Sequence, residues 1–256
     1  SLSSGRVNGR DEFDQGLWLS RNPTPARHAL TRRPESARVD QLLRNVRLSP
    51  SQVRAWHALD EARGERVRIL RGPAGAGKSA VAAALIAPEL AARPLAISPS
   101  TLPKGVNCAA FLHALSRPDS IAGELADQLA EQDETFARVR ERTSAQLDAW
   151  AREGRVHRES ATARNFLLPV REWLSLSNGS ARLHVLLDGL DQVSDRHRAG
   201  FTEFIHQLTT SEDFSGVRLV ITERSPQSGE VSVGATVVVQ EPTWGDVLPA
   251  VKGAKS

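Results

Sequence analysis

A glycine-rich segment of eight residues constrains the fold of this chain more than any other feature. Residues 72–79 read Gly-Pro-Ala-Gly-Ala-Gly-Lys-Ser and match the pattern G-x-x-x-x-G-K-[ST] at every fixed position. A short apolar run, Val67–Leu70, precedes this segment, and an alanine-rich stretch, Ala80–Leu90, follows it. In a strand–loop–helix context of this kind, the pattern wraps its backbone around a polyphosphate. The segment therefore predicts a P-loop.

The residues of the predicted P-loop have distinct chemical tasks. Its glycines bring backbone N–H groups close to the phosphates, and the following helix adds the positive end of its dipole. We expect the ammonium of Lys78 on the β- and γ-phosphates and the hydroxyl of Ser79 in the shell of a Mg²⁺ ion. The predicted nucleotide-binding set is Gly72, Pro73, Ala74, Gly75, Ala76, Gly77, Lys78, Ser79 and Ala80.

A second motif lies at residues 184–192, His-Val-Leu-Leu-Asp-Gly-Leu-Asp-Gln. Its apolar strand ends in Asp188, where a carboxylate would hold Mg²⁺ through water, because this ion keeps much of its hydration. Asp191 follows three residues later and is positioned to orient or polarise an attacking water. Structural alternatives remain open for both, since Asp188 suits a helix cap and Asp191 suits a turn before a helix near Asp195.

A third motif is the apolar strand Val217–Thr222, which runs into Glu223, Arg224 and Ser225. A polar group at the end of such a strand lies beside the nucleotide-binding edge of the sheet. We therefore predict that Thr222 or Arg224 senses the γ-phosphate. The alternative is that Arg224 is a surface arginine in a loop.

The order of elements predicts an α/β fold with a parallel sheet covered on both faces. Ligands bind at the carboxyl ends of the strands in such sheets, where all three motifs fall. The expected strands are Val67–Leu70, Asn107–Leu112, Val185–Leu187, Val217–Thr222 and Ala235–Gln240. The expected helices are Ser49–Arg63, Ala80–Leu90, Ile121–Gln132, Phe136–Trp150, Asn165–Leu176 (bent or started near Pro169) and Arg198–Leu208, with a shorter one around Ser36–Val46.

Together the three motifs resemble those of the STAND class of signal-transduction ATPases, and within it the NACHT-type NTPases. The likeness rests on Gly189 after Asp188, on Asp191 at the downstream acidic position, and on the strand that leads into Arg224. The segment Val7–Glu12 is similar to the apolar-G-R-acid motif that often precedes such cores.

The resemblance implies a three-layer P-loop NTPase sandwich with a five-stranded, mostly parallel sheet in the order 5-1-4-3-2. It also implies a switch that is closed with ADP, that forms a homo-oligomer with ATP, and that uses Mg²⁺, in bacterial defence or regulation. The predicted catalytic residues are Lys78, Asp188, Asp191 and Arg224, and the predicted metal ligands are Ser79 and Asp188. Gln192 and Glu223 depart from the family pattern, which indicates slow hydrolysis.

We expect three regions along the chain. Residues 1–48 form a polar segment or linker, 49–250 the P-loop NTPase core, and 251–256 the start of a C-terminal lid region. Glu241–Leu248 resembles the link into that lid. Because the chain lacks methionine and stops after a helical start, we interpret it as a segment of a longer protein.

Two further functions are compatible with these motifs. A nucleic-acid motor of the helicase kind is one, because Gln52 lies shortly before the P-loop, where such motors carry an adenine-reading glutamine. Gly189 argues against it, since a helicase needs an acidic residue directly after Asp188. A scaffold that holds nucleotide without turnover is the other, and Gln192 and Glu223 keep it open.

Composition narrows the remaining choices. The net charge is +3, and the arginines are scattered among acids, which favours a solvated surface over a nucleic-acid site. A single cysteine, Cys108, excludes an internal disulfide and favours a cytoplasmic setting, where it would be a small buried hydrophobe. No apolar run approaches the roughly 18–20 residues of a membrane helix. Trp56, Trp150 and Trp173 are predicted to be core residues.

Overall fold

The computed structural model describes residues 39–43, 48–95, 102–103, 105–153, 160–177, 181–224 and 235–238. A five-stranded sheet in the order β2-β3-β4-β1-β5 forms its centre, and every neighbouring pair of strands is parallel. The strands are β1 (Val67–Gly72), β2 (Cys108–Phe111), β3 (Leu183–Asp188), β4 (Val217–Arg224) and β5 (Ala235–Val238). This order is 5-1-4-3-2 read from the other edge, so the predicted fold class and strand order are confirmed.

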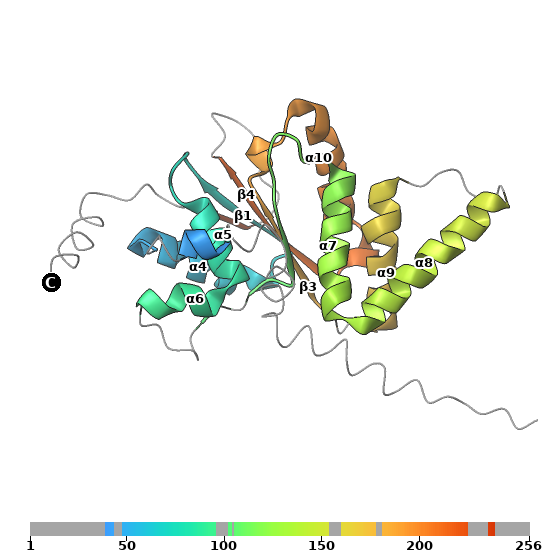
Figure 1. Ribbon diagram of the computed structural model, residues 1–256. Helices are drawn as coiled ribbons and strands as arrows, with labels where there is room; N and C mark the ends of the chain where they lie inside the picture. Colours follow the sequence, from blue (N-terminus) through green and yellow to red (C-terminus); the bar gives the residue numbers. More distant parts are fainter. Residues whose placement is uncertain are drawn as a thin grey trace, which may run out of the picture.

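Helices cover both faces of the sheet, which makes the fold a three-layer sandwich (Figure 1). One layer contains α4 (Pro50–Glu61), α5 (Lys78–Ile86) and α6 (Pro88–Ala92). The other layer contains α7 (Pro118–Gln132), α8 (Glu134–Arg152), α9 (Leu168–Leu176) and α10 (Asp195–Thr210). Short 3-10 turns at 62–64, 93–95, 190–192 and 212–214 connect these elements.

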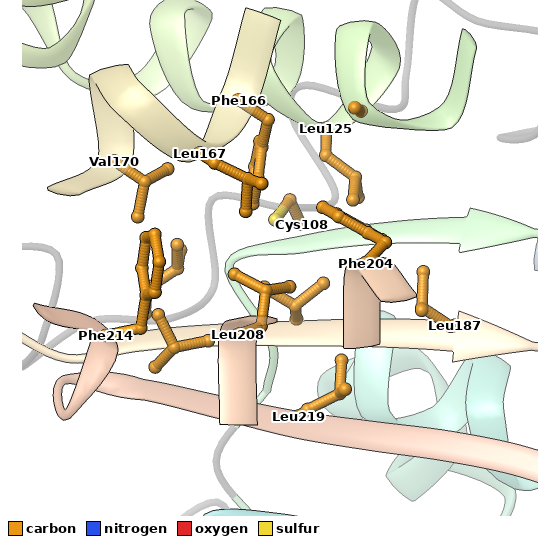
Figure 2. Close-up of a cluster of buried hydrophobic side chains, with 14 of the residues drawn as sticks. Cys108, Leu125, Phe166, Leu167, Val170, Leu187, Phe204, Leu208, Phe214 and Leu219 are labelled. Atoms are coloured by element: carbon orange, nitrogen blue, oxygen red, sulfur yellow. The ribbon is translucent and has the colours of Figure 1, made fainter. Parts of the chain in front are cut away.

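The two faces of the sheet carry different apolar clusters. The α5 face joins Trp56 and Leu59 of α4 to Leu70, Leu186 and Val220 of the strands, around a helix made largely of alanine. The opposite face is rich in aromatic side chains, and Figure 2 shows part of its cluster packed between the helices and the strands. Its large members are Phe136, Phe166, Trp173, Phe201, Phe204 and Phe214.

Successive residues of the central strands alternate between these two faces, as the two-residue repeat of a strand requires. In β4, Leu219 and Ile221 join the aromatic cluster, whereas Val220 joins the cluster under α5. Thr222 therefore lies on the α5 face at the end of its strand. Asp188 lies on the same face, because Leu186, two residues earlier in β3, packs under α5.

Local signals explain where several helices begin. Ser49 caps α4 in a capping box with Gln52, and Asp133 caps α8 by accepting a hydrogen bond from the N–H of Phe136 at 2.8 Å. A π-helical turn, Ala163–Leu167, runs directly into α9, and Pro169 lies in the first turn of α9. Because proline has no N–H to donate to the preceding turn, the regular hydrogen-bond pattern of the helix is interrupted where the π-helical turn meets α9.

Most of the predicted elements agree with the observed bounds within a few residues, but one core assignment is wrong. Trp56 and Trp173 are buried, whereas Trp150 is 37% exposed, because it lies near the end of α8, which extends past the sheet (Figure 1). The predictions for Val7–Glu12, Glu241–Leu248 and 251–256 fall outside the described residues.

Candidate functional site

The glycine-rich loop joins the end of β1 to the start of α5, as the sequence predicted. Gly75 and Gly77 adopt positive φ values of 82° and 84°, a region that residues with side chains rarely enter. The Nζ atom of Lys78 donates to the carbonyl oxygens of Gly72 at 2.8 Å and Pro73 at 2.9 Å. Lys78 and Ser79, the first two residues of α5, are half-buried.

Asp188 ends β3 in the position expected of a metal-binding carboxylate and is only 1% exposed. The hydroxyl of Thr222 donates to its Oδ1 atom at 2.5 Å, and the same hydroxyl accepts a hydrogen bond from the N–H of Gly189 at 2.8 Å. Gly189 has a φ of 86°, and a Cβ atom there would lie 2.7 Å from the side chain of Gln192. The backbone and Thr222 thus fix the orientation of the Asp188 carboxylate.

The second oxygen of this carboxylate, Oδ2, is buried and accepts no hydrogen bond from the described part of the chain. A buried carboxylate oxygen without a donor is costly unless a cation or a water supplies the missing interaction. This oxygen and the Ser79 hydroxyl are both hard donors, the kind that Mg²⁺ prefers. The residues present therefore fit a magnesium ion bound through Ser79 and Asp188.

Asp191 and Arg224 form an ion pair at the same edge of the sheet, with 2.9 Å between Arg224 Nε and Asp191 Oδ2. The Asp191 side chain is 18% exposed and that of Arg224 is 64% exposed. Burial lowers the pKa of the Lys78 ammonium, while the charges of Asp191 and Asp188 raise it and that of Arg224 lowers it further. The charges of Asp188, Asp191 and Arg224 thus all act on Lys78.

Glu223, which departs from the family pattern, has a charged partner in the structure. Arg71 of β1 lies opposite Glu223 of β4 in the parallel register, and Arg71 Nε donates to Glu223 Oε1 at 2.6 Å. Because strand residues alternate, this pair lies on the face opposite Asp188 and Thr222. The sequence carries no local signal for the pair, because it depends on the register between distant strands.

Gln52 is buried, and both the oxygen and the nitrogen of its side-chain amide form hydrogen bonds within the protein. Its Oε1 atom accepts from the N–H of Ser49 at 2.9 Å, and its Nε2 atom donates to the carbonyl of Ala76 in the P-loop at 3.0 Å. These bonds occupy the groups that an adenine-reading glutamine would offer to a base. The serine–glutamine spacing of a capping box was the sequence signal that could have revealed this role.

The structure brings the predicted loop, Asp188, Asp191, Thr222 and Arg224 to one edge of the sheet. The side chain of Ala80 packs into the core under α5, and its N–H donates to the carbonyl of Gly77 at 2.9 Å. In the described part of the chain, no three acidic, histidine or cysteine side chains gather around a common point.

This strand order and loop define the fold class of the protein, a P-loop NTPase-like α/β domain. The sequence profile described as nephrocystin 3, N-terminal, matches residues 45–224, which is more than half of the chain. The chain therefore belongs to the nephrocystin 3 N-terminal family. The match covers α4 as well as all of the predicted site residues, from Gly72 to Arg224.

Other comparisons are distant. A structure of PCH-2 from C. elegans aligns with 80% of this chain and 47% of its own length, at 13% sequence identity and a TM-score of 0.33. The chain thus spans about half of that protein, and the fold assignment rests on the strand order rather than on this similarity. No functionally curated protein matches the chain. Among the described helices, none has the length and apolar character needed to cross a membrane.

Proposed function

We propose that this chain is a nucleotide-binding NTPase core that holds ATP or ADP together with Mg²⁺. The observation that carries the proposal is the glycine loop, in which Lys78 begins α5 and donates to the carbonyls of Gly72 and Pro73, at the sheet edge where Asp188 ends β3. A cation between a glycine-lined loop and two carboxylates suits a ligand that carries both phosphates and a divalent metal.

Each polar residue of the site has a role in this proposal. Lys78 exchanges its contacts with the Gly72 and Pro73 carbonyls for phosphate oxygens. Ser79 and the free Oδ2 atom of Asp188 hold the metal, while Thr222 keeps the carboxylate in place. Magnesium bound there neutralises charge that develops on the phosphates during transfer.

Asp191 and Arg224, which form an ion pair, complete the site in this proposal. Arg224 contacts the γ-phosphate, and Asp191 orients the attacking water. Because each of these residues neutralises the other, a triphosphate has to compete with Asp191 for Arg224. That competition, with Gln192 in place of a second acid, supports slow rather than fast hydrolysis.

We further propose that residues 49–250 are the core of a signalling switch that forms a homo-oligomer when ATP replaces ADP. This part rests on the resemblance of the three motifs to NACHT-type NTPases. Sedimentation velocity of the intact protein with its trigger, in ADP and in a non-hydrolysable ATP analogue, tests it. Larger assemblies with the analogue would support the switch, and the same monomer in both nucleotides would contradict it.

The nucleotide site itself is tested by isothermal calorimetry on the wild type and Lys78→Ala. Removing a charged hydrogen-bonding partner costs about 1.5–3 kcal/mol, so we expect the affinity for ATP to fall at least tenfold. Arg171→Ala is a suitable control, because Arg171 is exposed on α9, on the opposite side of the sheet. Equal affinities of the wild type and Lys78→Ala would overturn the proposal.

A further inference from the structure

Gln52 connects the first helix of the core to the phosphate loop, although 24 positions separate it from Ala76. Its Nε2 atom donates to the Ala76 carbonyl at 3.0 Å in a buried contact, and Gln52 as a whole is 6% exposed. Its Oε1 atom is held by the N–H of Ser49, while its own N–H donates to the Ser49 hydroxyl at 3.3 Å. The side-chain amide is therefore fixed at both ends.

Gly77 provides the space for this contact. A Cβ atom built on Gly77 would lie 2.0 Å from Gln52 Nε2 and 2.9 Å from the carbon of the same amide. Gly77 is thus required twice, once for its φ of 84° and once for the close approach of Gln52. The amide occupies the position that a side chain at residue 77 would take.

The direction of the Ala76–Gly77 peptide follows from this bond. The described part of the chain contains no cis peptide bond, so the carbonyl of Ala76 and the N–H of Gly77 point in opposite directions. Because Gln52 holds the carbonyl on the side of α4, the N–H of Gly77 faces the other side of the loop. In loops of this pattern, backbone N–H groups that point into the loop hold the phosphates.

We propose that Gln52 is a positioning residue that orients the Gly77 N–H toward the phosphates of the bound nucleotide. This inference rests on the proposed nucleotide-binding function and adds α4 to the phosphate-binding apparatus. Gln52 acts through the loop and does not touch the base. Its contribution should therefore be the same for any ligand that places a polyphosphate in the loop.

The experiment compares the affinities of ATP, ADP and inorganic tripolyphosphate for the wild type, Gln52→Leu and Ser49→Ala by calorimetry. Gln52→Leu removes the bond to Ala76, and we expect all three ligands to bind about three- to tenfold more weakly, as for the loss of one neutral hydrogen bond. Ser49→Ala removes only the hydroxyl of the capping box and leaves both bonds of the Gln52 amide. We expect its affinities to stay within about twofold of the wild type.

Each other outcome has a distinct meaning. If Gln52→Leu weakens ATP but not tripolyphosphate, Gln52 reads the base and the inference is wrong. If Ser49→Ala loses as much affinity as Gln52→Leu, the effect belongs to the helix cap, which also overturns it. If Lys78→Ala binds tripolyphosphate as tightly as the wild type, the proposed function fails instead.

A second variant serves if Gln52→Leu does not fold. Gln52→Glu keeps an oxygen for the N–H of Ser49, since glutamate serves in a capping box as well as glutamine does, but it has no donor for the Ala76 carbonyl. We expect it to weaken tripolyphosphate at least as much as Gln52→Leu would. Unchanged binding by a folded Gln52→Glu protein would contradict the role assigned to Gln52.

Discussion

The two faces of the central sheet are packed with side chains of very different size. Under α5 the cluster includes a run of small residues, Ala80, Ala82, Ala83 and Ala84, whereas the opposite face is filled by phenylalanine and tryptophan. Small side chains let a helix lie close to the strands, because the distance between packed elements follows the residues at the contact. The α5 face thus holds the start of its helix near the ends of β3 and β4, where the site residues lie.

The aromatic face holds most of the buried phenylalanines, and none of the predicted site residues belongs to its cluster. Burying an aromatic side chain removes a large area from water, so this layer supplies much of the stability of the fold. The difference indicates that the stability of the fold and the proposed nucleotide site depend on different layers. Substitutions on the two faces should therefore separate the two properties.

The largest effect on stability is expected from Phe204→Ala on the aromatic face. Phe204 is 1% exposed and packs edge-on against Phe166, with 5.7 Å between the ring centroids. Loss of such a side chain costs about 3–5 kcal/mol, measured as the free energy of unfolding in urea. The affinity of the remaining folded protein for ATP should stay unchanged, and a parallel loss of affinity would show that the two faces are not separable.

A smaller loss of stability, accompanied by a loss of affinity, is expected from Ala83→Leu in α5. Ala83 is fully buried, so the added carbons have no space, and overpacking costs about 1–3 kcal/mol. Because the strain falls on the helix that follows the P-loop, ATP should also bind more weakly, which calorimetry on the folded variant would detect. Ala151→Leu, on an exposed turn of α8, is the matched control and should change neither quantity.

The smallest effect concerns the buried carboxylate on the aromatic side, Asp133, which caps α8. Burial raises the pKa of Asp133, and the N–H of Phe136 opposes that shift. The folded state therefore binds a proton on the Asp133 carboxyl more tightly than the unfolded chain does. The stability that this protonation contributes is lost as the pH rises from the ordinary aspartate pKa, about 4, through the pKa of the folded state.

Asp133→Asn removes the titratable carboxyl and keeps an oxygen that accepts from the N–H of Phe136. The free energy of unfolding of the variant minus that of the wild type should increase as the pH rises from about 4 to 7. Urea unfolding of both proteins at each pH measures this difference. A difference that does not change with pH would mean that Asp133 does not titrate differently in the folded state.

The sequence predicted the edge of the site because parallel strands end on the same side. Asp188, Thr222 and Arg224 could be placed beside the P-loop for this reason alone. The contacts among them depend on the register between strands, which no local pattern encodes. The bond from Thr222 to Asp188 and the pair between Arg71 and Glu223 are examples.

Two further residues show the limits of reading the sequence locally. Trp150 fits the apolar stripe of a helix, but it is exposed because α8 extends past the core. How far a helix extends past the core depends on the whole fold. Gln52 matches the position of an adenine-reading glutamine in a motor protein, because the sequence shows its place before the P-loop but not its packing against Gly77. Contacts between segments far apart in the sequence could be seen only in the structure.

The most direct test of the proposed site is the stabilisation of the folded chain by nucleotide and metal together. With Mg²⁺ present, ATP at 100 times its dissociation constant should raise the free energy of unfolding by about 2.7 kcal/mol. The increase should shrink when EDTA removes the metal or when Asp188→Asn replaces the wild type. A free energy of unfolding that ATP and Mg²⁺ leave unchanged at every concentration would contradict the assignment of this edge as a nucleotide site.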